Sequence, residues 1–171
     1  VAAGEWWRIF TAALLHGSWM HIGFNMYALY LFGPRMEQQV GSPSFAALYV
    51  AAAGAGGLAS YLFGSIDQVS IGASGAIFGL FGAWIFVAWK MRHTPGGRSM
   101  FTQLFVLLAI NIVISLTPGI DGWAHFGGFI AGIGIAALWS VLAVGKSNAV
   151  GIRTAIALGV IALDLAAVLL L

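Results

Sequence analysis

Six apolar runs, separated by short polar segments, occupy most of the chain. They lie at about residues 19–40, 45–63, 71–89, 101–116, 123–144 and 152–171. The first is interrupted at Gly33-Pro34, and we expect it to continue through Met36 to Val40. An apolar run of roughly 20 residues is long enough to cross a bilayer as an α-helix. The pattern therefore predicts an all-α polytopic membrane protein, folded as one membrane domain over residues 1–171.

The composition supports this interpretation. Hydrophobic residues make up 61% of the chain and charged residues 7%, whereas about a quarter of the residues in soluble domains are charged. Backbone in lipid must be hydrogen-bonded internally, and long apolar runs favour helices over a barrel of alternating strands. The net charge of +2 is too small and dispersed to indicate nucleic-acid binding. The absence of cysteine excludes a disulfide framework, a thiol nucleophile and a thiolate metal site.

Residues 1–18 differ from the runs that follow. They carry Glu5, Trp6, Trp7 and Arg8, and tryptophans beside charges are typical of the lipid headgroup region. We expect this segment to be partly helical and to lie in the outer interface without spanning the membrane. The chain starts at Val1 without a recognisable signal peptide, so we expect it to be part of a longer protein.

The basic residues of the loops predict an orientation. If residues 1–18 lie outside, six of the seven Lys and Arg residues fall on the cytoplasmic side, namely Arg35, Lys90, Arg92, Arg98, Lys146 and Arg153. This distribution follows the positive-inside rule and favours a bacterial inner (plasma) membrane. The same orientation brings four polar residues of the apolar runs to one depth near the outer face, namely His21, Asn25, Ser74 and His125.

Ser74 begins the third apolar run within the sequence Gly72-Ala73-Ser74-Gly75. A serine at this place is commonly an N-cap. It can also be a nucleophile, because the free N–H groups of a helix N-terminus can stabilise an oxyanion. Gly72 and Gly75 would let a substrate carbonyl approach the backbone closely.

His125 is the candidate base for Ser74. An imidazole in lipid is costly and indicates function, although a structural hydrogen bond to a neighbouring helix is the alternative. Phe78, one turn after Ser74, is a candidate to pack on the His125 ring, or an ordinary core residue. The sequence places no carboxylate beside His125, since Asp121 is in a loop. We therefore predict a Ser–His dyad, not a triad.

Two glycine stripes would let the helices of this dyad approach each other. Gly128 and Gly132 follow His125 on one helix face, and Gly75, Gly79 and Gly82 follow Ser74 on another. Small residues at these spacings allow close helix contact in membranes. Packing alone would also explain the glycines, and both interpretations can hold together.

Spacing and position in the sequence suggest roles for the other polar residues. His21 and Asn25 are four residues apart, so they share a helix face and offer two donors to an oxyanion, or interhelical hydrogen bonds. Interhelical or anchoring hydrogen bonds are expected for four further residues, namely His16, Asn111, Ser115 and Asp164. A zinc site at His16 and His21 is disfavoured, because a suitable motif and a nearby carboxylate are lacking.

Together these motifs resemble the rhomboid family of intramembrane serine proteases. The resemblance covers about residues 4–144 and rests on Glu5-Trp6-Trp7-Arg8, His21-x-x-x-Asn25, Gly72-x-Ser74-Gly75 and Ala124-His125-x-x-Gly128. It implies a rhomboid-like six-helix bundle whose first helix would precede Val1, with residues 152–171 as an added helix. It also implies a serine endopeptidase in which Ser74 is the nucleophile and His125 the general base and acid. His21, Asn25 and the Ser74 backbone would surround the oxyanion.

The resemblance further implies that the substrates are transmembrane segments of other proteins, which we expect to enter laterally beside the fourth run. No cofactor, metal or nucleic acid is expected. Two alternatives remain from other functional classes. An inactive rhomboid-like protein would bind membrane proteins without cleaving them, and it would lack the serine or the histidine, which this chain retains. A small transporter would favour internal duplication and more buried carboxylates than Asp164.

Overall fold

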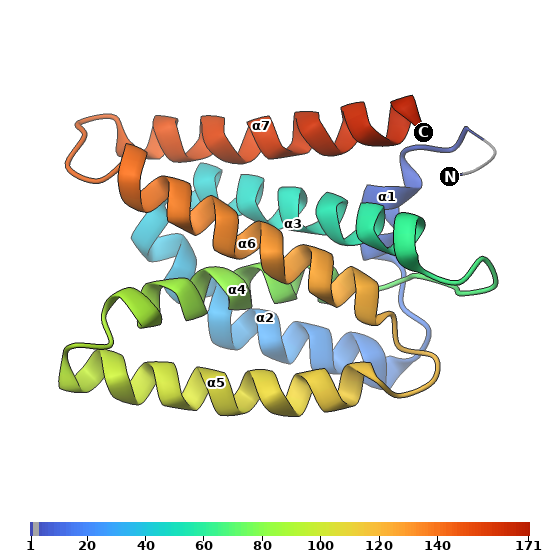
Figure 1. Ribbon diagram of the computed structural model, residues 1–171, viewed down its shortest axis with the longest axis horizontal. Coiled ribbons are helices and arrows are strands. Elements are labelled where there is room, and N and C mark those ends of the chain that lie inside the picture. Colours follow the sequence, from blue (N-terminus) through green and yellow to red (C-terminus); the bar gives the residue numbers. More distant parts are fainter. Residues whose placement is uncertain (2–3) are drawn as a thin grey trace.

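The computed structural model describes residue 1 and residues 4–171, and all the regular secondary structure in these residues is helical (Figure 1). A short helix and a 3-10 turn precede six long helices. The helices are α1 (Arg8–Thr11), η1 (Ala12–Leu14), α2 (Trp19–Val40), α3 (Ser42–Phe63), α4 (Ser74–Lys90), α5 (Pro95–Ser115), α6 (Gly122–Leu142) and α7 (Ala149–Leu170). The prediction of an all-α bundle is therefore confirmed.

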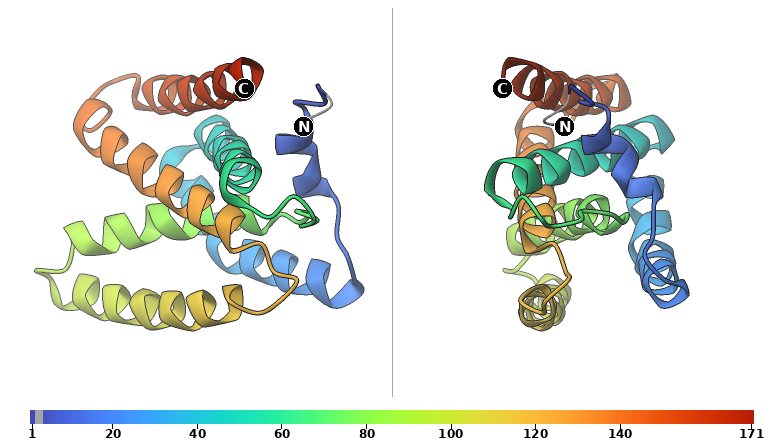
Figure 2. Two further views of the ribbon diagram at one scale, coloured as in Figure 1. Left: turned by 45° about the vertical axis from the view of Figure 1, so that its right-hand side comes forward. Right: turned by 90° about the vertical axis from the view of Figure 1, so that its right-hand side faces the viewer.

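The helix α4 lies in the interior of the bundle. Most of its residues are buried, and α2, α3, α5 and α6 all pack against it. Figure 2 shows α5 and α7 at opposite sides of the bundle, with α3, α4 and α6 between them. The buried core is formed by side chains such as Leu48, Leu80 and Ile135, each at most 1% exposed. Because α4 is surrounded in this way, its side chains can contact residues of several other helices.

Capping residues determine where several helices begin. The side chains of four N-cap residues accept a backbone N–H from the first helical turn, namely Ser18, Thr94, Asp121 and Asn148. The fourth long helix along the chain, α5, illustrates the effect, because it begins at Pro95 although its apolar run begins only at about residue 101. Thr94 accepts the Gly97 N–H at 3.0 Å, and Pro95 occupies the first turn, where its missing N–H costs nothing.

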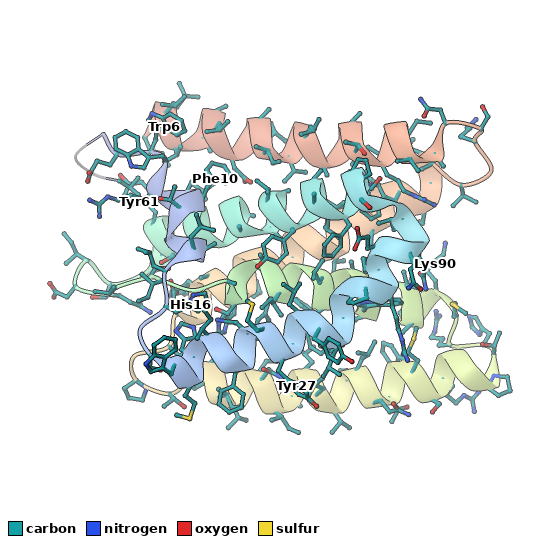
Figure 3. The ribbon with its side chains drawn as sticks, turned by 180° about the vertical axis from the view of Figure 1, so that it is seen from behind. Trp6, Phe10, His16, Tyr27, Tyr61 and Lys90 are labelled. Atoms are coloured by element: carbon teal, nitrogen blue, oxygen red, sulfur yellow. The ribbon has the colours of Figure 1, made fainter. Side chains whose placement is uncertain are left out.

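The helix α2 continues through Pro34 to Val40, as expected from the sequence. Proline removes one helical hydrogen bond and clashes with the preceding turn, so it bends the helix. Figure 3 shows α2 changing direction toward its C-terminal end. The indole of Trp84 on α4 donates a hydrogen bond to the Phe32 carbonyl at 3.2 Å, close to this bend. The contact fixes α2 against α4.

The two glycine stripes face each other across α4 and α6. A Cβ atom added at Gly128 would collide with the carbonyl oxygen of Gly75, and one added at Gly132 would collide with that of Gly79. A Cβ at Gly82 would likewise collide with the Phe129 carbonyl. The two backbones therefore pack directly on each other, as small residues allow in membrane helices.

In the part of the chain that the structure describes, four helices are long and apolar enough to cross a membrane, namely α3, α5, α6 and α7. The buried helix α4 is also apolar but has 17 residues. Exposed apolar side chains cover the outer faces of these helices, for example Phe105 and Val113 on α5, which suits a lipid surface. Figure 3 shows His16 and Lys90 at opposite ends of the molecule.

Candidate active site

Ser74 and His125 meet although 51 residues separate them in the sequence. The Ser74 Oγ lies 2.8 Å from the His125 Nε2. Ser74 is the first residue of α4 and His125 lies in the first turn of α6, so both are at the same end of the bundle. The Ser74 hydroxyl bonds to this imidazole and does not cap its own helix. The close α4–α6 contact at Gly75 and Gly128 makes this distance attainable.

Phe78 lies against the face of the His125 ring. The ring centroids are 4.2 Å apart and the planes differ by 7°. Phe78 is one turn after Ser74 on α4, so one helix carries both the hydroxyl and the aromatic surface. The stacked ring restricts rotation of the imidazole about its side-chain bonds and keeps Nε2 directed at Ser74.

The other nitrogen of the imidazole contacts a residue that the sequence did not single out for the site. The His125 Nδ1 lies 2.6 Å from the Ser115 Oγ at the end of α5. Ser115 also donates to the Asn111 carbonyl at 2.8 Å. Its spacing from Asn111 suggested interhelical contacts. The only sequence signal for the site was that Ser115 ends the apolar run just before that of His125.

Asp121 caps α6. Its Oδ1 accepts the Ala124 N–H at 3.0 Å, whereas its Oδ2 is buried without a hydrogen-bond partner among the described residues. The position beside His125 that a carboxylate would take in a triad is therefore occupied by the Ser115 hydroxyl.

His21 and Asn25 converge beside Gly72, two residues before Ser74. A Cβ added at Gly72 would lie 2.6 Å from the His21 Nε2 and 3.6 Å from the Asn25 Nδ2. Gly72 has φ +119°, which side chains other than glycine rarely adopt. Its N–H donates to the Ala12 carbonyl at 3.0 Å, which links this loop to η1.

Asn25 and His21 bring side-chain nitrogens to this corner. Asn25 is 6% exposed, and its Nδ2 has no hydrogen-bond partner in the part of the chain described here. The Gly17 N–H donates to the His21 Nδ1 over a long 3.5 Å, which favours the tautomer with its proton on Nε2. Two side-chain donors therefore point toward Gly72.

Two other polar residues each bury an atom that has no hydrogen-bond partner among the described residues. His16 was expected to anchor its segment by hydrogen bonds, but its Nε2 has no partner among the residues described, and its ring packs edge-on against His21 at 5.1 Å. Asp164 was expected to form an interhelical hydrogen bond. Its buried Oδ2 lies beside Gly54 of α3 and likewise finds no partner within the described residues. The facing surface is apolar there, with Phe10 also against Gly54.

An open cleft of about 1050 Å³ borders the imidazole. It is bounded by the end of α5, the start of α6 and the loop before α4, and its lining includes Ser65, Gln68, Ser115, His125 and Phe126. The Gln68 side chain donates to the Ile120 carbonyl at 3.4 Å and so joins the two loops over the cleft. Among the described residues, no group of three or more His, Asp or Glu side chains is placed to hold a metal ion.

Comparison with known proteins identifies the family of this chain. The model of the Rhomboid domain family matches residues 3–142. Rhomboid protease GluP of Bacillus subtilis (strain 168) is 38% identical over 164 residues, which is 95% of this chain and 31% of GluP. YdcA of the same organism is 36% identical over 133 residues, or 77% of this chain and 66% of YdcA. RHOMBOID-like protein 5 of Arabidopsis thaliana is 38% identical over 136 residues, or 77% of this chain and 43% of that protein.

The chain thus spans between about a third and two thirds of the length of these relatives. The matched region contains Ser74, His125, His21 and Asn25 together with the helices that carry them. The apolar helices and this match both indicate an integral membrane protein. The resemblance inferred from the sequence motifs is confirmed: the chain belongs to the rhomboid family.

Proposed function

We propose that this chain forms the active core of an intramembrane serine endopeptidase, which hydrolyses peptide bonds in transmembrane segments of other proteins. The observation that carries the proposal is the 2.8 Å contact between the Ser74 Oγ and the His125 Nε2 at the N-terminus of an apolar helix. A hydroxyl within hydrogen-bond reach of an imidazole is the arrangement of an activated nucleophile. Family membership, with a relative named as a rhomboid protease, supports the same reaction.

In this reaction the Ser74 oxygen attacks the carbonyl carbon of the scissile bond while the His125 Nε2 takes the hydroxyl proton. The C–N bond then breaks, and the same nitrogen returns the proton to the leaving amine. Water hydrolyses the resulting ester on Ser74, again with His125 as base. The open cleft borders His125, the base that would activate this water.

The negative charge on the substrate oxygen is stabilised by donors already in place. The Ser74 backbone N–H is at the first position of α4, where no carbonyl of the same helix accepts it. The His21 Nε2 and the Asn25 Nδ2 converge beside Gly72. An unpartnered buried donor such as the Asn25 Nδ2 is costly in the resting protein and gains an acceptor only when an oxyanion forms.

Substrate segments enter laterally beside α5. This helix is at the edge of the bundle (Figure 2), and its C-terminal end forms one wall of the cleft. The loop residues Ser65, Asp67 and Gln68 provide polar groups above the cleft. We place this end of the bundle at the outer face of a bacterial inner membrane, because most loop Lys and Arg residues lie toward the other end.

The test is cleavage of a model transmembrane substrate by the full-length protein in liposomes. Ser74→Ala and His125→Ala are each expected to abolish cleavage, and a fluorophosphonate is expected to label the wild type at Ser74 only. Ser140→Ala is the matched control, because this α6 serine donates to the Ala137 carbonyl of its own helix and has no other hydrogen-bond partner within the described residues. Full cleavage by both the Ser74 and the His125 variants would refute the proposal. Binding of the substrate by wild type without cleavage would indicate an inactive binding protein instead.

A further inference from the structure

Both nitrogens of the His125 ring have partners, and one of these partners belongs to a helix outside the Ser–His pair. The Nε2 faces the Ser74 hydroxyl at 2.8 Å, and the Nδ1 faces the Ser115 hydroxyl at 2.6 Å. The Ser115 hydroxyl also contacts the Asn111 carbonyl oxygen at 2.8 Å. These contacts form one continuous hydrogen-bond chain from the α5 backbone, through α6, to α4.

The number of available protons favours one direction for these hydrogen bonds. A hydroxyl has one proton to donate, and Ser115 donates it to the Asn111 carbonyl, which can only accept. The 2.6 Å contact is therefore a hydrogen bond only if the His125 Nδ1 carries a proton and donates it to Ser115. A neutral imidazole protonated at Nδ1 has its lone pair on Nε2, which is where the Ser74 proton must go. If Nδ1 were the acceptor, Nε2 would carry the proton and could not act as the base.

The Asn111 carbonyl, at which this series of hydrogen bonds begins, is held in place by α5 itself. Asn111 belongs to the last full turn of α5, and its side chain donates to the Leu107 carbonyl at 2.8 Å, one turn earlier. Asp121 is the acidic residue nearest to His125 in the sequence, and its Oδ1 accepts the Ala124 N–H as the N-cap of α6. Ser115 therefore takes the place beside His125 that a carboxylate would otherwise occupy.

The helix that supplies Ser115 is the least buried of the long helices around α4. Only Gly97 and Leu104 of α5 are buried, and Figure 2 shows α5 at the edge of the bundle. Ser115 therefore reaches His125 from the edge of the bundle.

We propose that Ser115 is a positioning residue that holds His125 in the Nδ1-protonated tautomer. This inference rests on the proposed function, since it concerns the base of that reaction. A neutral hydroxyl orients the ring, and it also accepts a hydrogen bond from the imidazolium formed after proton transfer.

The experiment compares Ser115→Ala, Ser115→Thr and Ser99→Ala in the full-length protein with the same transmembrane substrate. Fluorophosphonate labelling carried to completion counts the folded, reactive molecules, so that kcat is given per active site. For Ser115→Ala we expect kcat to fall about tenfold to a hundredfold with KM unchanged, because a hydrogen bond to a charged group is lost in the transition state. Ser115→Thr restores the hydroxyl and most of the rate. Ser99→Ala alters an exposed α5 serine that accepts a hydrogen bond from the Gln103 side chain, and it is expected to match the wild type.

Two results would overturn the inference. One is a wild-type kcat in Ser115→Ala. The other is equal impairment of the Ala and Thr variants accompanied by a rise in KM, which would show that Ser115 only packs α5 against the cleft. Ser74→Ala, measured in parallel, separates this inference from the proposed function. If Ser74→Ala is inactive while Ser115→Ala is fully active, only the role of Ser115 is refuted, whereas cleavage by Ser74→Ala refutes the protease itself.

Discussion

Gly128→Ala tests whether helix separation determines the geometry of the site. The added Cβ would overlap the Gly75 carbonyl oxygen on α4 and would lie 3.3 Å from the Ala52 carbonyl oxygen on α3. Neither backbone oxygen can rotate away as a side chain would, so α6 must move outward. A displacement of about 1 Å relieves the overlap, and it would lengthen the Ser74–His125 contact from 2.8 Å to about 3.8 Å, beyond hydrogen-bond range.

The expected consequence is a loss of about a hundredfold in kcat, since a misplacement of about 1 Å in reacting groups costs roughly that factor. Overpacking should also lower the free energy of unfolding by about 1–3 kcal/mol. The assay is cleavage of the model transmembrane substrate per folded molecule, with thermal unfolding monitored in the same detergent. Fluorophosphonate labelling of Ser74 should slow in parallel with cleavage, because both need the imidazole as base.

Gly134→Ala is the control on the same helix. Its added Cβ would have nothing within 4 Å, and it should leave both cleavage and stability at or slightly above the wild-type value, since alanine favours a helix more than glycine. Wild-type cleavage by a fully folded Gly128→Ala protein would refute the reasoning, because the dyad would then be independent of the α4–α6 separation.

Two further substitutions probe the surroundings of the dyad. Gly72→Ala should reduce cleavage at least about tenfold, because φ +119° is strained for alanine and the new Cβ would lie 2.6 Å from the His21 Nε2. Unchanged cleavage kinetics in this variant would exclude the corner at Gly72 as the oxyanion site. Phe78→Leu should lower kcat about threefold to tenfold, because the aromatic stack on His125 is worth about 0.5–1.5 kcal/mol. Phe78→Tyr keeps the stack and should retain the rate, and equal kcat values for the Leu and Tyr variants would contradict an orienting role.

The expectations about local structure came from patterns that operate within one helix. Apolar run length and composition predicted the helices, because a backbone in lipid has few alternatives. Four-residue spacing predicted that His21 and Asn25 would share a face, and glycine spacing predicted the α4–α6 contact. Helix starts were less well predicted, since α5 begins at the Thr94-Pro95 cap and not at the first apolar residue.

The sequence by itself determined the helical class, the family and the four polar residues proposed for the site, because these depend on residue type and short-range spacing. Only the tertiary structure decided that Ser115 contacts His125, that Asp121 serves as a cap and that Asp164 faces an apolar surface. The reason is that in a membrane protein lipid-facing and helix-facing residues are equally apolar. The rotation of one helix against another is therefore weakly marked in the sequence, and it is fixed only when all the helices pack together.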